Sequence, residues 1–286
     1  MTSINFGFFN ELEKLAIKVV DRNLPVYKRP ISGILGRVSS PETALFTLSS
    51  DPLKPGPTKK DKNLAEIIKA YSKDPELKNL KIYLNHQSAV DRAKDIMANK
   101  RTSGVRKLLA LAFSPMTSFA TSIGRSDHYD PAAHSVTLYT NSPAILAHEL
   151  GHAKDYGRGN LEFKLLTRQL ADHLPLKPGT LYSEAKASAT AHEKLKKTKS
   201  FKHDVKSRGL LGGAFGTYVG GAVGALMASR DAKRGRGRLG GRAKLRQAGY
   251  ILGGSALGRI VASAAQHLAN RRHAAKNAVP KHATHK

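Results

Sequence analysis

Two histidines and a glutamate stand at a spacing that suggests metal-dependent hydrolysis. The stretch AHELGH, residues 147–152, contains His148 and His152 four residues apart, with Glu149 directly after the first histidine. On a helix, side chains four residues apart lie on the same face, so both imidazoles can bind one zinc ion. Glu149 points in a neighbouring direction, where it can act as general base on a water molecule that the metal activates. This is the H-E-x-x-H arrangement of zinc hydrolases.

A third protein ligand must come from elsewhere in the sequence, and it must be His, Asp or Glu because the chain has no cysteine. Glu184 is the preferred candidate, because its neighbours are small and let two helices approach closely enough to share one ion. His192 is the second choice. Asp155 would lie on the same helix as the two histidines, where its side chain would be poorly placed to bind the metal. The other downstream candidates are Glu162, Asp172, His173 and Glu193.

Three further side chains could stabilise the negative charge that develops in the transition state of peptide hydrolysis. Tyr156, Tyr182 and His192 carry hydrogen-bond donors and lie close in sequence to the motif or to Glu184. A partly buried tyrosine or histidine has a structural role more often than a catalytic one. These three residues are therefore candidates rather than assignments.

The H-E-x-x-H motif lies in the middle of a predicted helix. Residues 134–140, HSVTLYT, alternate and are rich in β-branched side chains, which predicts a strand. Ser142 followed by Pro143 is a typical helix start, because serine caps the first turn and proline fits the first helical position. We expect this helix to run from Pro143 to about Tyr156 and to end at Gly157.

Other elements are expected around this strand and helix. Residues 80–85, LKIYLN, predict a short strand. Residues 108–115 and 117–122 are apolar and could form strands or buried helices. Helices are predicted over the ranges 63–75, 88–100, 160–174 and 181–198, with Glu184 in the first turn of the last one.

The N-terminal region is predicted to hold an amphipathic helix and a linker. Glu11 and Glu13 interrupt its apolar stretch and no basic region precedes it, so we expect no secretory signal peptide. Residues 23–62 are rich in Pro, Ser and Lys, which indicates a linker. The apolar residues at helical spacing are Phe8, Leu12, Leu15, Ala16 and Val19.

The stretch YDPAAHSVTLYTNSPAILAHELGHAKD, followed by SEAKASA, resembles the gluzincin class of zinc metallopeptidases. The resemblance implies a zincin-like fold in which His148, His152 and Glu184 bind zinc and Glu149 is the catalytic base. It also implies that residues 135–140 form an edge strand that aligns extended substrate.

The chain departs from the gluzincin pattern at one position. Many gluzincins have an aspartate four residues after the glutamate ligand, where it orients a zinc-bound histidine. This chain has Ser188 there. The serine could accept the imidazole N–H in its place, or a backbone carbonyl could do so.

Two Gly-rich apolar segments follow the predicted catalytic region. Residues 209–229 are uncharged and carry Gly212, Gly216, Gly220 and Gly224 at a four-residue spacing. This length matches a bilayer core, and the spacing is typical of helices that pack closely in lipid. Residues 248–269 repeat the pattern more weakly, because Arg259 interrupts them. The pair resembles a glycine-zipper hairpin and favours membrane association over a soluble hairpin or a flexible tail.

The charge of the chain is concentrated after the catalytic region. The formal net charge is +27, and residues 201–286 hold 17 Lys and Arg against 2 Asp and Glu. Such an excess favours anionic partners such as lipid headgroups or nucleic acid. The run KRGRGR, residues 233–238, suits phosphate contacts, so nucleic-acid binding remains a second hypothesis.

The sequence as a whole predicts an α+β protein that is a membrane-associated zinc metallopeptidase acting on protein or peptide substrates. The competing hypotheses are a membrane-active or virion-type structural protein with a residual metal site, and a basic nucleic-acid-associated protein. The predicted regions are 1–62 as helix and linker, 63–205 as a mostly helical zincin-like domain with a small sheet, 206–270 as the Gly-rich hairpin with a basic loop, and 271–286 as a disordered basic tail.

Overall fold

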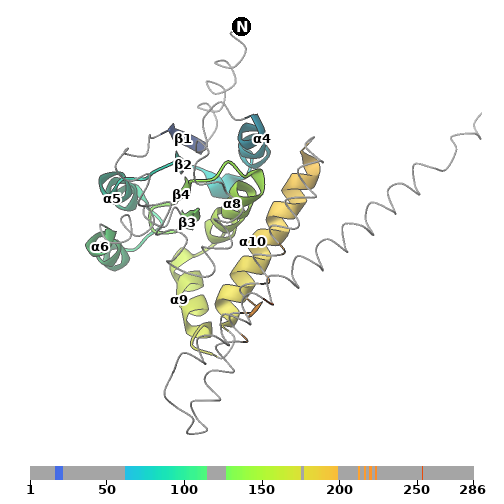
Figure 1. The fold of residues 1–286 in the computed structure, drawn as a ribbon. Coiled ribbons are helices and arrows are strands. Elements are labelled where there is room, and N and C mark those ends of the chain that lie inside the picture. Colours follow the sequence, from blue (N-terminus) through green and yellow to red (C-terminus); the bar gives the residue numbers. More distant parts are fainter. Residues whose placement is uncertain are drawn as a thin grey trace, which may run out of the picture.

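The computed structural model describes residues 17–21, 62–114, 127–174 and 177–198, together with positions 212, 216, 219, 220, 223 and 253. These residues form an α+β fold with six α-helices and a mixed sheet of four strands (Figure 1). Most of the predicted N-terminal helix, the linker up to residue 61, residues 117–122, most of both Gly-rich segments and the basic tail lie outside the described residues. No described helix has the length and apolar character needed to cross a membrane.

The sheet has the strand order β1-β2-β4-β3. β1 (Ile17–Asp21), β2 (Leu80–Leu84) and β4 (Ser135–Leu138) run parallel, and β3 (His128–Asp130) pairs antiparallel with β4. β4 is thus an interior strand of the described sheet. The expectation that it forms the edge is wrong, and β3 lies at that edge.

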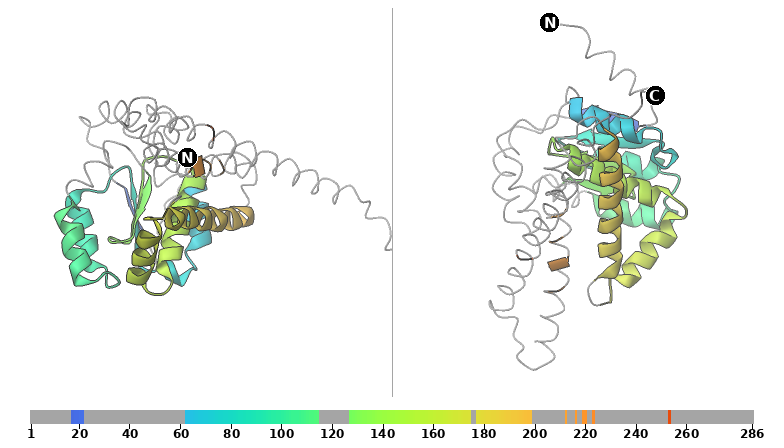
Figure 2. Two further views of the ribbon diagram at one scale, coloured as in Figure 1. Left: turned by 90° about the horizontal axis from the view of Figure 1, so that it is seen from below. Right: turned by 90° about the vertical axis from the view of Figure 1, so that its right-hand side faces the viewer.

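Helices cover both faces of the sheet, as Figures 1 and 2 show. α4 (Lys62–Tyr71), α8 (Pro143–Gly157) and α10 (Pro178–Lys197) lie on one side, and α5 (Ala89–Ala98) and α6 (Gly104–Ala112) lie on the other. A short 3₁₀ turn, η1 (Pro75–Leu77), precedes β2, and α9 (Leu161–Ala171) joins α8 to α10.

The hydrophobic core lies between the sheet and the helices α4 and α8. Alternate residues of β2 and β4, such as Ile82 and Val136, point into it and are fully buried. Leu146 and Leu150 of α8 meet them, and the Tyr71 hydroxyl donates to the Ala147 carbonyl at 2.8 Å. This packing fixes α8 against the sheet.

The opposite face of the sheet is polar although it is largely buried. Tyr83 Oη donates to the Asp95 carboxylate at 2.7 Å, and Gln87 Nε2 lies 3.1 Å from both Asp95 Oδ2 and Ser135 Oγ. Lys81 forms an ion pair with Asp95. These contacts satisfy the buried polar groups where α5 crosses the sheet.

The helix start at Ser142 and Pro143 is confirmed. The Ser142 hydroxyl accepts a hydrogen bond from the Ile145 N–H, proline occupies the first turn, and the helix ends at Gly157. The predicted strands at 80–85 and 134–140 are also confirmed in shortened form, as β2 and β4.

Several expectations need correction. Val19 lies in β1, where Ile17–Asp21 pair with β2, and not in a helix. Residues 108–113 belong to α6 and its cap, but no residue of α6 is buried, and Val105, Leu108 and Phe113 are each more than half exposed. α10 starts at Pro178, which places Glu184 in its second turn.

Candidate metal centre

The two helices that carry the candidate ligands lie side by side because small residues meet between them. A Cβ added at Gly151 of α8 would lie 2.6 Å from the Ala187 carbonyl oxygen of α10, a separation that real Cβ atoms do not show. Ala187 itself is fully buried. The short contact brings the His148–His152 face of α8 against the start of α10.

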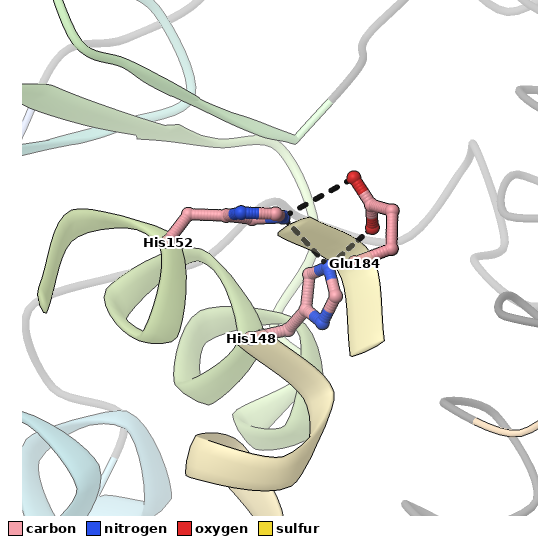
Figure 3. Close-up of side chains that lie close together, drawn as sticks. All are labelled: His148, His152 and Glu184. Carbon is pink, nitrogen blue, oxygen red and sulfur yellow. Dashed lines mark hydrogen bonds and ion pairs between the residues drawn. The ribbon is translucent and has the colours of Figure 1, made fainter. Parts of the chain in front are cut away.

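Glu184 meets both histidines at this contact (Figure 3). His148 Nε2 lies 3.0 Å from Glu184 Oε2, and His152 Nε2 lies 3.3 Å from Glu184 Oε1. The two Nε2 atoms are 3.1 Å apart. All three side chains are more than four-fifths shielded from solvent, with side-chain exposures of 9%, 11% and 14%.

These separations fit one tetrahedral zinc ion. Ligand atoms about 2.0–2.2 Å from zinc are about 3.3 Å from each other in tetrahedral geometry. Among the described residues, His148, His152 and Glu184 are the one group of three such side chains close enough to share a metal. The donor set, two imidazoles and a carboxylate, is one that zinc accepts.

Two serines of α10 face the other nitrogens of the imidazoles. Ser188 Oγ lies 3.2 Å from His148 Nδ1, and Ser183 Oγ lies 3.5 Å from His152 Nδ1. Ser188 thus occupies the place expected for the orienting group. Ser183 was missed from the sequence, although its position directly before Glu184 is the signal that could have indicated it.

Glu149 is buried beside this cluster and faces β3. Its carboxylate accepts a hydrogen bond from the Tyr129 backbone N–H. Burial raises the pKa of Glu149 to about 7, and the negative charges of Glu184 and Asp127 act in the same direction against the opposing effect of His148. A carboxylate with a pKa near neutrality can both accept and return a proton.

The pKa of Glu184 is shifted in the opposite direction, downward, by its two histidine partners. Burial alone would raise the pKa of its carboxyl group, but the contacts with His148 and His152 lower it to about 2. The carboxylate is therefore charged at neutral pH, as a metal ligand must be.

The remaining candidates lie elsewhere. His192 follows Glu184 by eight residues on α10, about 12 Å along the helix axis, and is not part of the cluster. Asp155 is buried among cations and forms ion pairs with Lys186 at 2.5 Å and with Arg168.

The two tyrosines proposed as transition-state stabilisers both flank Arg168. The Arg168 guanidinium lies 4.4 Å from the Tyr156 ring and 5.5 Å from the Tyr182 ring. Tyr156 also stacks on Tyr129, at 6.0 Å between ring centroids, whereas Tyr182 is 56% exposed. Tyr156 is thus held in a packed position, and Tyr182 is the one with an accessible side chain.

Comparison of the chain with protein-family models, with curated proteins and with solved structures finds no match. A function for this protein is therefore inferred from its own residues and their geometry.

Proposed function

We propose that this protein is a zinc-dependent metallopeptidase of zincin-like architecture. The observation that carries the proposal is the convergence of His148 Nε2 and His152 Nε2, 3.1 Å apart, on the Glu184 carboxylate, whose two oxygens lie 3.0 and 3.3 Å from them, beside the buried Glu149. If the Nδ1 atoms carry the imidazole protons, three lone pairs meet at one point, and a cation there relieves their repulsion.

The chain's own groups can carry the proton transfers of peptide hydrolysis. A zinc ion bound by His148, His152 and Glu184 would lower the pKa of a water molecule to about 7 and polarise the scissile carbonyl. Glu149, with its pKa near neutrality, would take a proton from the attacking water and pass it to the leaving amine. Its hydrogen bond from Tyr129 holds the carboxylate between α8 and β3.

The substrate strand is expected to pair with β3. β3 is the strand at the β4 end of the described sheet, and one of its backbone N–H groups, that of Tyr129, reaches Glu149. β3 therefore lies beside the proposed catalytic base, at one edge of the described sheet. A peptide that pairs with an edge strand gains backbone hydrogen bonds, and pairing at β3 would place its carbonyl groups near the cluster.

Metal analysis combined with casein cleavage tests the proposal. We expect about one zinc per purified wild-type chain, a reduced content in Glu184→Ala, and a full content without activity in Glu149→Gln. Glu66→Gln is the matched control, because Glu66 is exposed on α4. No zinc in the wild-type protein after incubation with the metal would overturn the proposal. Zinc without cleavage in any variant would favour a residual metal site in a structural protein.

Membrane association through residues 209–229 and 248–269 remains a prediction, as does nucleic-acid binding through the basic run. Sedimentation with anionic vesicles supports the first hypothesis. Nucleic-acid binding with a steep salt dependence, but no vesicle binding, supports the second.

A further inference from the structure

We propose that Arg168 is a positioning residue for His152 and that it acts through the hydroxyl of Ser183. The inference rests on the proposed metal site, because it concerns how one of its ligands is presented. Neither Arg168 nor Ser183 belongs to the H-E-x-x-H motif or to the ligand set.

A short relay leads from α9 to the cluster. Arg168 Nη1 donates to Ser183 Oγ at 3.1 Å, and Ser183 Oγ lies 3.5 Å from His152 Nδ1. The close approach depends on Gly179 in the first turn of α10, since a Cβ there would lie 2.2 Å from the Arg168 carbonyl oxygen. The start of α10, which carries Ser183, is thereby held against the end of α9.

The guanidinium is itself held on several sides. Its Nη2 atom forms an ion pair with the buried carboxylate of Asp155, which lies one turn after His152 on α8. Its carbon atom lies over the Tyr156 ring at 4.4 Å and near the Tyr182 ring at 5.5 Å. An arginine fixed by an ion pair and two aromatic rings offers its remaining N–H group in one direction.

By fixing the Ser183 hydroxyl, Arg168 determines which ring nitrogen of His152 carries the proton. A neutral imidazole binds a metal through Nε2 when its proton lies on Nδ1, and an acceptor near Nδ1 favours that tautomer. Ser183 Oγ has two lone pairs, so it can accept the Arg168 N–H and the His152 Nδ1–H together. His148 has an equivalent acceptor in Ser188, which has no described arginine contact.

Lysine cannot replace Arg168 in this relay. The planar guanidinium reaches Asp155 with one nitrogen and Ser183 with the other, whereas an ammonium group is a single point charge. Arg168→Lys should keep the pairing with Asp155, and hence the fold, while it releases Ser183.

The test combines a metal-free and a metal-dependent measurement on the full chain. In the metal-free protein, imidazole ¹⁵N NMR should show His152 mainly protonated on Nδ1, and Arg168→Lys and Ser183→Ala should lower that population. In competition with a chelator, each variant should bind zinc about 10-fold more weakly than wild type. Arg106→Lys is the matched control: Arg106 also pairs with α9, through Glu162 at 2.6 Å, but has no described contact with the cluster.

A double-mutant cycle separates the relay from a general structural effect. If Arg168 acts through Ser183, the combined variant should bind zinc no more weakly than Ser183→Ala alone. Additive losses, or an unchanged His152 tautomer in both single variants, would overturn the inference. If the two variants show the expected tautomer shift but the wild-type protein binds no zinc, the proposed function is refuted and the relay stands.

Discussion

At the scale of single residues, the cluster is unusual because the atoms that face one another can all act as metal ligands. Two imidazole nitrogens lie 3.1 Å apart, each within 3.3 Å of one oxygen of the Glu184 carboxylate, and all three side chains are shielded from water. Serine hydroxyls lie at both Nδ1 atoms, and both Nε2 atoms are directed at the carboxylate. The proposed metal ion would account for this convergence.

The choice between Glu184 and His192 as third ligand gives a prediction at this scale. His192→Ala should bind zinc with the affinity of the wild type, because His192 lies about 12 Å from Glu184 along α10. His148→Ala should lose at least about 100-fold in affinity. Isothermal titration with zinc after chelator treatment measures both. A comparable loss in the two variants would mean that His192 is the ligand.

At the scale of elements, the site exists because α8 and α10 approach closely. The contact at Gly151 involves the backbone of Ala187, which cannot move aside as a flexible side chain would. Of the described elements that touch α8, α10 is the one that carries the third residue of the cluster. The spacing of these two helices therefore decides whether Glu184 reaches the histidines.

Gly151→Ala should separate the two helices and weaken the site. Alanine favours the helix by about 1 kcal/mol over glycine, but overpacking against a backbone atom costs about 1–3 kcal/mol. We expect a net loss of stability in urea unfolding and a zinc affinity reduced by at least about 10-fold. Gly104→Ala is the control, since a Cβ at Gly104 in the first turn of α6 meets nothing within 4 Å. Equal behaviour of the two variants would contradict the role of this contact.

Local signals predicted the elements that carry the site. Ser142 and Pro143 mark the start of α8 through capping and backbone preferences that act within a few residues, and the helix ends at Gly157, where an added Cβ would lie 2.5 Å from the Glu76 Cβ. The small residues around Glu184 predicted the close approach of α10. The metal-site hypothesis could be built from these signals alone.

Long-range pairing could not be predicted in the same way. Val19 pairs with Ile82 across more than 60 positions, so its helical spacing with Leu12 and Leu15 was misleading. The placement of β4 inside the sheet depends on β3, a strand of three residues with little pattern of its own. The relay from Arg168 to Ser183 likewise depends on a helix contact and has no signature in sequence spacing.

At the scale of the whole molecule, the sheet separates two kinds of interior. The side of α4 and α8 is apolar and supports the site, whereas the side of α5 is a buried network of polar contacts. The β3–β4 turn holds His134, which is 6% exposed and adopts a positive φ of 51°. Its ring meets Tyr129 edge to face, and Tyr129 Oη lies 3.1 Å from its Nδ1.

The stability of the whole fold should depend on pH through His134. Burial lowers the pKa of His134 from 6.5 to about 4, and the nearby Arg101 charge acts in the same direction. Between these two values the unfolded chain binds a proton that the folded protein does not, so the free energy of unfolding falls as the pH falls. The loss attributable to His134 between pH 7 and pH 4 is at most about 3 kcal/mol, since each pKa unit corresponds to about 1.4 kcal/mol.

His134→Asn isolates this contribution, because asparagine tolerates a positive φ and does not titrate. The variant should be less stable than the wild type at pH 7, because it lacks the contact between the neutral His134 ring and Tyr129. The difference should shrink as the pH falls from 6.5 to 4, since only the wild type loses the His134 contribution there. Carboxylates that titrate in the same range cancel in the comparison. Urea unfolding of both proteins at half-unit pH steps measures the effect. Parallel curves for the two proteins would show that His134 is not held in its neutral form by the fold.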